Sequence, residues 1–165
     1  MLKKILILLI IFYIFTLIQT SFFIHFNEFL GRYKTCIPNL ILISLILITF
    51  FENPQKKDSI ILAFFGGFFL NLFSNQWPGL EIIILMLIVF FIKKFLGILN
   101  KKSFLFFALI FVFSLFFYDL IISISDNIFK FYFDFKFISL KVCYSLIIGS
   151  IGYYALRKYG KIFEK

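Results

Sequence analysis

Long apolar runs separated by short charged breaks constrain this chain more than any other feature. A bilayer core about 30 Å thick takes roughly 20 helical residues per crossing, so six crossings would occupy about 120 residues of the chain. The sequence has 165 residues, of which 62% are hydrophobic, whereas soluble domains are roughly half apolar. We therefore expect an all-α integral membrane protein, with one transmembrane domain of about six helices over residues 1–165.

The charged breaks predict where each helix lies. We expect helices over residues 5–26, 37–51, 59–73, 80–92, 103–125 and 137–156. The second is expected to open with Pro38 in its first turn, where a missing N–H costs little. Lys93, Lys94, Lys101 and Lys102 are expected to bracket a short amphipathic link. The third and fourth helices are short enough to form a re-entrant hairpin instead of two full crossings.

Both ends of the chain are expected on the cytoplasmic side. The first apolar run is longer than a signal-peptide core and is not followed by a small-x-small cleavage site, so we interpret it as a retained helix. With the amino end inside, twelve of the 17 basic residues fall on the inner side and five on the outer side. The positive-inside rule therefore favours this orientation. The net charge of +9 is explained by lysines at helix ends, rather than by a nucleic-acid-binding face.

Four features, in order, carry a resemblance to a known family. They are Ile18-Gln19-Thr20-Ser21, the pair Pro38-Asn39, the segment from Gly67 to Gly79, and Asp119 in the fifth apolar run. In this order they resemble the bacterial rod shape-determining protein MreD family, over nearly the whole chain. In the third segment, Gly67, Asn71, Leu72, Ser74 and Gly79 have the family spacing. Asn71 stands where the family usually has Asp, and an amide can still accept hydrogen bonds although it cannot ionise.

The resemblance implies a function and a location. It implies a multi-pass protein of the bacterial inner (cytoplasmic) membrane that acts as a scaffold of the cell-wall elongation machinery. Its partner would be the bitopic protein MreC, which links MreB filaments inside the cell to a RodA-type glycosyltransferase and its transpeptidase. The candidate polar-core or partner-binding residues are Gln19, Pro38, Asn39, Gly67, Asn71, Ser74, Gly79 and Asp119.

The third helix carries a stripe of small and polar residues. Asn71 lies four positions after Gly67, and Ser74 lies seven positions after Gly67. These residues therefore lie near one face of a helix. Such stripes let helices approach closely in lipid and supply interhelical hydrogen bonds. Burial inside the bundle and contact with a partner or ligand are both open interpretations.

Asp119 is the single residue most indicative of a specific role, because it is a carboxylate inside a predicted transmembrane helix. An ionised carboxylate inside a transmembrane helix costs roughly 2.5 to 3.5 kcal/mol on insertion scales, so it should face the bundle and have a partner. Tyr118 and Ser123 are nearby donors. A structural or partner-binding role, solvation near the outer surface, and proton transfer all remain open.

The other polar residues support neither a metal site nor catalysis. His25 is the only histidine, and a metal site needs several converging ligands, so no metal or cofactor is expected. Glu81 is expected in the first turn of a helix, where a negative charge complements the helix dipole. Cys36 and Cys143 could pair only if their Cα atoms came within about 7 Å. With one deep carboxylate and one histidine, the chain is not expected to be an enzyme.

Two non-enzymatic functions remain. The first is the membrane scaffold that the resemblance implies. The second is a substrate-capture subunit of an energy-coupling-factor vitamin transporter, since MreD is similar to these small subunits in hydropathy and helix number. A capture subunit needs an enclosed pocket with convergent polar groups, whereas the predicted outer loops over residues 27–37 and 126–136 are short and carry scattered charges. We favour the scaffold.

Overall fold

The computed structural model describes residues 2–22, 38–74, 77–99, 103–126 and 135–159. Six α-helices and one π-helical turn make up the ordered secondary structure of these residues, which contain no strand, so the all-α prediction is confirmed. The elements are α1 (Leu2–Leu17), the π-turn η1 (Ile18–Phe22), α3 (Leu40–Phe51), α4 (Asp58–Phe73), α5 (Leu80–Leu99), α6 (Phe104–Asp126) and α7 (Phe135–Tyr159).

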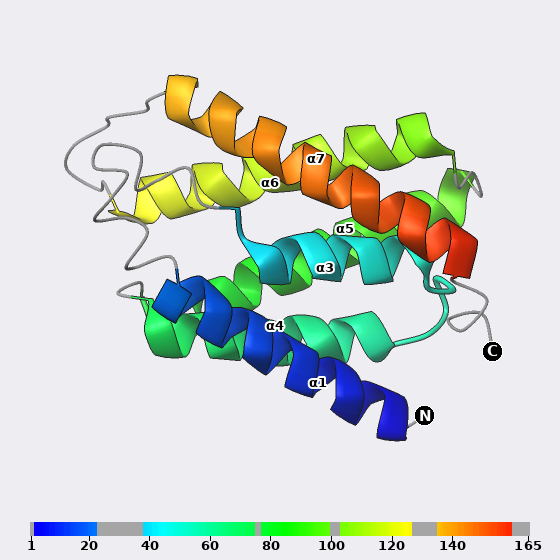
Figure 1. Ribbon diagram of the computed structural model, residues 1–165, viewed down its shortest axis with the longest axis horizontal. Helices are drawn as coiled ribbons and strands as arrows, with labels where there is room; N and C mark the ends of the chain where they lie inside the picture. The colour runs from blue at the N-terminus through cyan, green and yellow to red at the C-terminus, as the bar shows by residue number, and fades with distance from the viewer. Residues whose placement is uncertain (1, 23–37, 75–76, 100–102, 127–134, 160–165) are drawn as a thin grey trace.

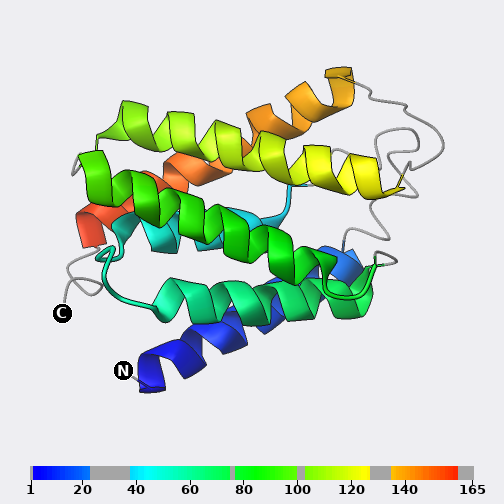
Figure 2. The same cartoon turned by 180° about the vertical axis from the view of Figure 1, so that it is seen from behind.

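The helices form one bundle in which successive helices run in opposite directions (Figure 1). The central helix is α3, with α1 and α4 on one side and α6 and α7 on the other; Figure 2 shows α5 crossing the opposite face. The start of α1 and the end of α7 lie at the same end of the bundle. We call this the Glu52 end, after the residue that follows α3, and the opposite one the Asn39 end, after the residue that precedes α3.

Helix α3 forms the core because it is apolar on every side. Nine of its 12 residues are buried, as expected for a helix with no polar face. Aromatic side chains from the neighbouring helices close over its C-terminal half, where the Phe50 ring packs against Phe107 at 5.2 Å and against Tyr153 at 6.1 Å between centroids. The core is therefore assembled around the shortest α-helix of the described residues.

Two predicted boundaries were wrong. Pro38 does not lie in the first turn of α3, because Asn39 is the N-cap and the helix begins at Leu40. The fourth predicted helix does not end at Ile92, and Lys93 and Lys94 lie within α5 rather than bracketing a link. The helix continues because the Lys93 ammonium is paired with Glu52 inside the protein.

Two helices of the described residues are long and apolar enough to cross a membrane, over Phe104–Ser125 and Ser139–Lys158. The apolar stretches Ile5–Ser21, Leu40–Phe51 and Asp58–Phe73 are shorter. Helix α5 has 20 residues, about 30 Å at 1.5 Å per residue, and it carries Glu81, Lys93 and Lys94. The first two of these charged residues are buried.

Candidate functional site

The most developed polar site lies at the Asn39 end and begins with the cap of α3. The Asn39 side chain is 4% exposed, and its Oδ1 accepts a hydrogen bond from the Leu42 backbone N–H at 3.1 Å. This is the bond that an N-cap supplies to an otherwise unpaired helical N–H. Its Nδ2 is thereby free to reach another helix, and it donates to the Tyr118 hydroxyl of α6 at 3.0 Å.

Tyr118 links Asn39 to α5 through a second hydrogen bond of its hydroxyl. Its hydroxyl donates to Glu81 Oε2 at 2.7 Å, and both side chains are buried. Glu81 does lie in the first turn of α5, as predicted, but its environment is more than a helix dipole, because it also accepts this buried hydrogen bond. Sequence reasoning did not place Tyr118 and Glu81 together.

Asp119 faces the bundle and has a charged partner. It is 7% exposed, and its Oδ1 accepts from Lys141 Nζ of α7 at 2.6 Å. This agrees with the expectation of a partnered carboxylate, although the partner is Lys141 and not Tyr118 or Ser123. The same ammonium lies 5.9 Å from the centroid of the Tyr118 ring, within the range of a cation–π contact. Asp119 Oδ2 is buried and has no hydrogen-bond partner among the described residues.

The first helix joins the same site through the π-turn. Gln19 lies in η1, and its Oε1 accepts from the Leu40 backbone N–H at 3.3 Å. Single π-turns occur often at functional sites, because they shift the helix register locally. We refer to Gln19, Asn39, Glu81, Tyr118, Asp119 and Lys141 together as the Asn39 network. It connects η1, α3, α5, α6 and α7.

Gly67 and Gly79 shape the hairpin of α4 and α5. A Cβ added at Gly67 would lie 2.5 Å from the Ile82 Cα and 2.8 Å from the Ile82 backbone nitrogen. Only glycine therefore allows this approach of the two backbones. Gly79 has a φ of +88°, a conformation that L side chains rarely adopt. Both residues act through the backbone: Gly67 by close packing, and Gly79 by opening the turn into α5.

Asn71 and Ser74 lie in and just after the last turn of α4. Asn71 Oδ1 and Ser74 Oγ are buried, and neither has a hydrogen-bond partner among the described residues. The interhelical hydrogen bonds expected of this stripe are thus not made through these two atoms. The close contact of α4 with α5 comes from Gly67.

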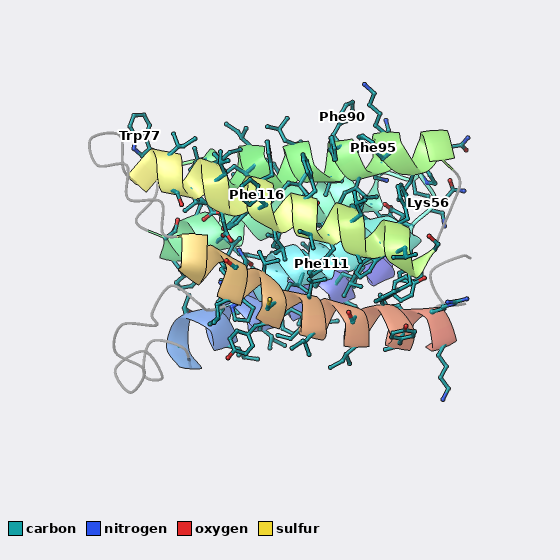
Figure 3. All side chains as sticks on the ribbon, turned by 90° about the horizontal axis from the view of Figure 1, so that it is seen from above. Lys56, Trp77, Phe90, Phe95, Phe111 and Phe116 are labelled. Carbon is teal, nitrogen blue, oxygen red and sulfur yellow. The ribbon has the colours of Figure 1, made fainter. Side chains whose placement is uncertain are left out.

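A second buried ion pair lies at the Glu52 end and was not predicted. Lys93 Nζ lies 2.8 Å from Glu52 Oε2 and also donates to the Lys56 backbone carbonyl. The Ser59 backbone N–H lies 3.3 Å from each Glu52 carboxylate oxygen. Glu52 and Lys93 therefore tie the turn between α3 and α4 to α5. Lys56 and Trp77 mark the two ends of the bundle in Figure 3.

Several candidates cannot be placed. His25, Cys36 and the predicted outer loop over residues 27–37 lie outside the described residues, as do residues 127–134 of the loop predicted over 126–136. The ends of that second loop are helical, because α6 extends to Asp126 and α7 begins at Phe135. Cys143 is exposed and free. Within the described ranges, no group of three or more histidine, cysteine, aspartate or glutamate side chains could hold a metal ion.

Comparison with known proteins identifies no similar protein. The chain matches no protein-family model, and neither a curated protein nor a solved structure is detectably similar to it. The resemblance to the MreD family therefore depends on the four sequence features alone.

Proposed function

We propose that this chain is a multi-pass scaffold of the cell-wall elongation machinery in the bacterial inner membrane, and that it binds an MreC-like bitopic protein. The observation that carries the proposal is the Asn39 network, in which side-chain hydrogen bonds join Asn39 to Tyr118 and Tyr118 to Glu81. In the same network, Gln19 accepts from the Leu40 backbone and Lys141 pairs with Asp119. Interhelical hydrogen bonds in membranes contribute about 0.6 to 2 kcal/mol each. Such a network supports a rigid platform on which another membrane protein can assemble.

Exposed apolar side chains support the transmembrane part of the proposal. Leu105 is 82% exposed, Leu109 and Ile151 are each 67% exposed, and Phe90 is 65% exposed. Large contiguous apolar surface is rare on soluble monomers. These residues come from α5, α6 and α7, and the proposal places them against lipid.

All six helices can belong to a spanning bundle despite their unequal lengths. Helix α3 has 12 residues, about 18 Å at 1.5 Å per residue, which is less than the bilayer core. It lies at the centre of the bundle (Figure 1), and non-helical backbone is tolerated at membrane depth where protein surrounds it. In α5, Glu81 is near the first residue, and Lys93 is paired with Glu52. The charges of α5 therefore need not face lipid.

The scaffold fits the polar groups better than vitamin capture does. A capture subunit needs polar groups that converge on an enclosed pocket. In the Asn39 network, the Tyr118 hydroxyl bonds Asn39 and Glu81, and the Lys141 ammonium bonds Asp119. These hydrogen bonds join neighbouring helices to one another, which favours a structural role.

Affinity purification from the native host in mild detergent tests the scaffold. We expect an MreC-like bitopic protein to co-purify with the tagged chain at near-equal amounts. The matched control is the same chain with Gly67→Leu, which we expect to lose the partner because its α4–α5 hairpin cannot close. Recovery without such a protein, together with a vitamin-induced rise in thermal stability of the purified chain, would instead support the capture subunit.

A further inference from the structure

An apolar groove between α5 and α6 has features that the scaffold role does not use. Its cavity volume is about 290 Å³, and its lining includes Leu87, Phe90, Phe91 and Lys94 of α5 with Phe113 and Phe117 of α6. This is near the lower limit of the roughly 300 to 1,000 Å³ range of small-molecule pockets. The groove is open to the side of the bundle, where Phe90 projects outward (Figure 3).

The walls of the groove are aromatic and flat. The Phe91 and Phe113 rings stack with centroids 5.0 Å apart and planes 17° apart, and Phe113 stacks on Phe117 at 6.3 Å. From Leu87 to Lys94 the groove follows α5 for about 10 Å, at 1.5 Å per residue. A slot of this length and chemistry matches a segment of an extended acyl chain.

Polar groups are present at two points of the groove. Lys94 is exposed and lies toward the Glu52 end, next to Lys93, whose charge is already paired with Glu52. Ser114 is 1% exposed and also lines the groove. Its hydroxyl has no hydrogen-bond partner in the part of the chain that the structure describes. Among the described residues, Lys94 has no ion-pair partner, so one such lysine and one buried hydroxyl border an otherwise apolar slot.

We propose that the α5–α6 groove binds an anionic phospholipid, with its headgroup at Lys94 and an acyl chain along Phe91, Phe113 and Phe117. A lysine close to the anionic cytoplasmic surface of a membrane is attracted to it by about 1 kcal/mol, or about fivefold in affinity. The Glu52 end is the cytoplasmic one under the proposed orientation, so Lys94 lies on the leaflet side that is rich in such lipids. The inference depends on the membrane-spanning bundle and not on the role in cell-wall elongation.

Quenching of a single tryptophan by brominated lipids tests this proposal. The reporter is the full chain with Trp77→Phe and Phe90→Trp, reconstituted in mixed phosphatidylglycerol and phosphatidylcholine vesicles in which one lipid at a time is brominated. We expect brominated phosphatidylglycerol to quench as though enriched about fivefold at the groove. Lys94→Gln should abolish the preference and Lys94→Arg should retain it. Lys57→Gln, at an exposed lysine in the turn before α4, should leave it unchanged.

Three outcomes would overturn the proposal. Equal quenching by both brominated lipids would show that the groove does not select anionic lipid, while leaving the membrane-spanning bundle intact. Quenching by neither lipid from a chain that is monomeric in detergent would place Phe90 out of lipid contact and would contradict the spanning bundle as well. Protection from both lipids together with a doubled mass in detergent would assign the groove to a second copy of the chain.

Discussion

Replacing Gly67 with alanine should destabilise the bundle by about 1 to 3 kcal/mol, and replacing it with leucine should prevent assembly. The added Cβ would lie 2.5 Å from the Ile82 Cα, closer than non-bonded carbon atoms approach. Relief requires α5 to move away from α4, because the obstacle is backbone and cannot change rotamer. Overpacking of this kind typically costs 1 to 3 kcal/mol even where side chains can adjust.

Gly97→Ala is the matched control for Gly67→Ala. Gly97 is also a helical glycine, in α5, but a Cβ there would meet nothing within 4 Å. Alanine is the better helix former by about 1 kcal/mol, so this variant should be neutral or slightly stabilised. The measurement is the thermal unfolding midpoint of each purified variant in one detergent. If Gly67→Ala and Gly97→Ala have equal midpoints, the close approach of α4 and α5 is wrong.

Removing one partner of the Asp119–Lys141 pair should cost about 3 to 5 kcal/mol, the range for breaking a buried ion pair. Asp119→Leu leaves the Lys141 ammonium, which is 17% exposed, without its carboxylate. Asp119→Asn keeps an acceptor oxygen at the same position and should lose less. The double variant Asp119→Leu with Lys141→Met removes both charges and should recover most of the loss, because replacing a whole buried pair by apolar residues is often neutral.

The wild type, Asp119→Leu, Lys141→Met and the double variant form a double-mutant cycle. The quantity measured for each is the free energy of unfolding in detergent. We expect Asp119→Leu and Lys141→Met each to be strongly destabilising and the double variant to be close to wild type. Costs that simply add in the double variant would contradict a direct pair between α6 and α7. Equal losses for Asp119→Asn and Asp119→Leu would show that the charge of the carboxylate, rather than its capacity to accept hydrogen bonds, is what α7 requires.

The bounds of a helix could be predicted from the sequence where an apolar run is flanked by charged or polar residues. Helix α6 was expected over residues 103–125 and occupies Phe104–Asp126, and α4 was expected over 59–73 and occupies Asp58–Phe73. In both cases charged or polar residues flank a largely apolar run. Close packing at Gly67 was one of the two interpretations that the sequence left open for the small-residue stripe.

The polar pairs were not predictable, because each depends on how distant helices are rotated against one another. From the sequence, Lys93 is interpreted as a lysine at the membrane boundary. In the structure it pairs with Glu52, which lies 41 positions earlier. Lys141 is one of the five basic residues expected on the outer side. A usable signal existed, since a lone carboxylate within one apolar run and a lone lysine in the next are suited to pair across an antiparallel hairpin. Which donor reaches Asp119 still depends on the rotation of α7.

The central proposal is that the six helices cross the bilayer in alternating directions with both ends of the chain in the cytoplasm. Topology reporter fusions test it most directly. Fusions after Lys57, Lys102 and Lys165 should all report the cytoplasm, and fusions after Arg32, Gln76 and Lys130 should all report the outside. The twelve-to-five distribution of basic residues and the shared end of α1 and α7 support this pattern. An external signal after Lys165, with a cytoplasmic signal after Lys57, would contradict the six-helix bundle.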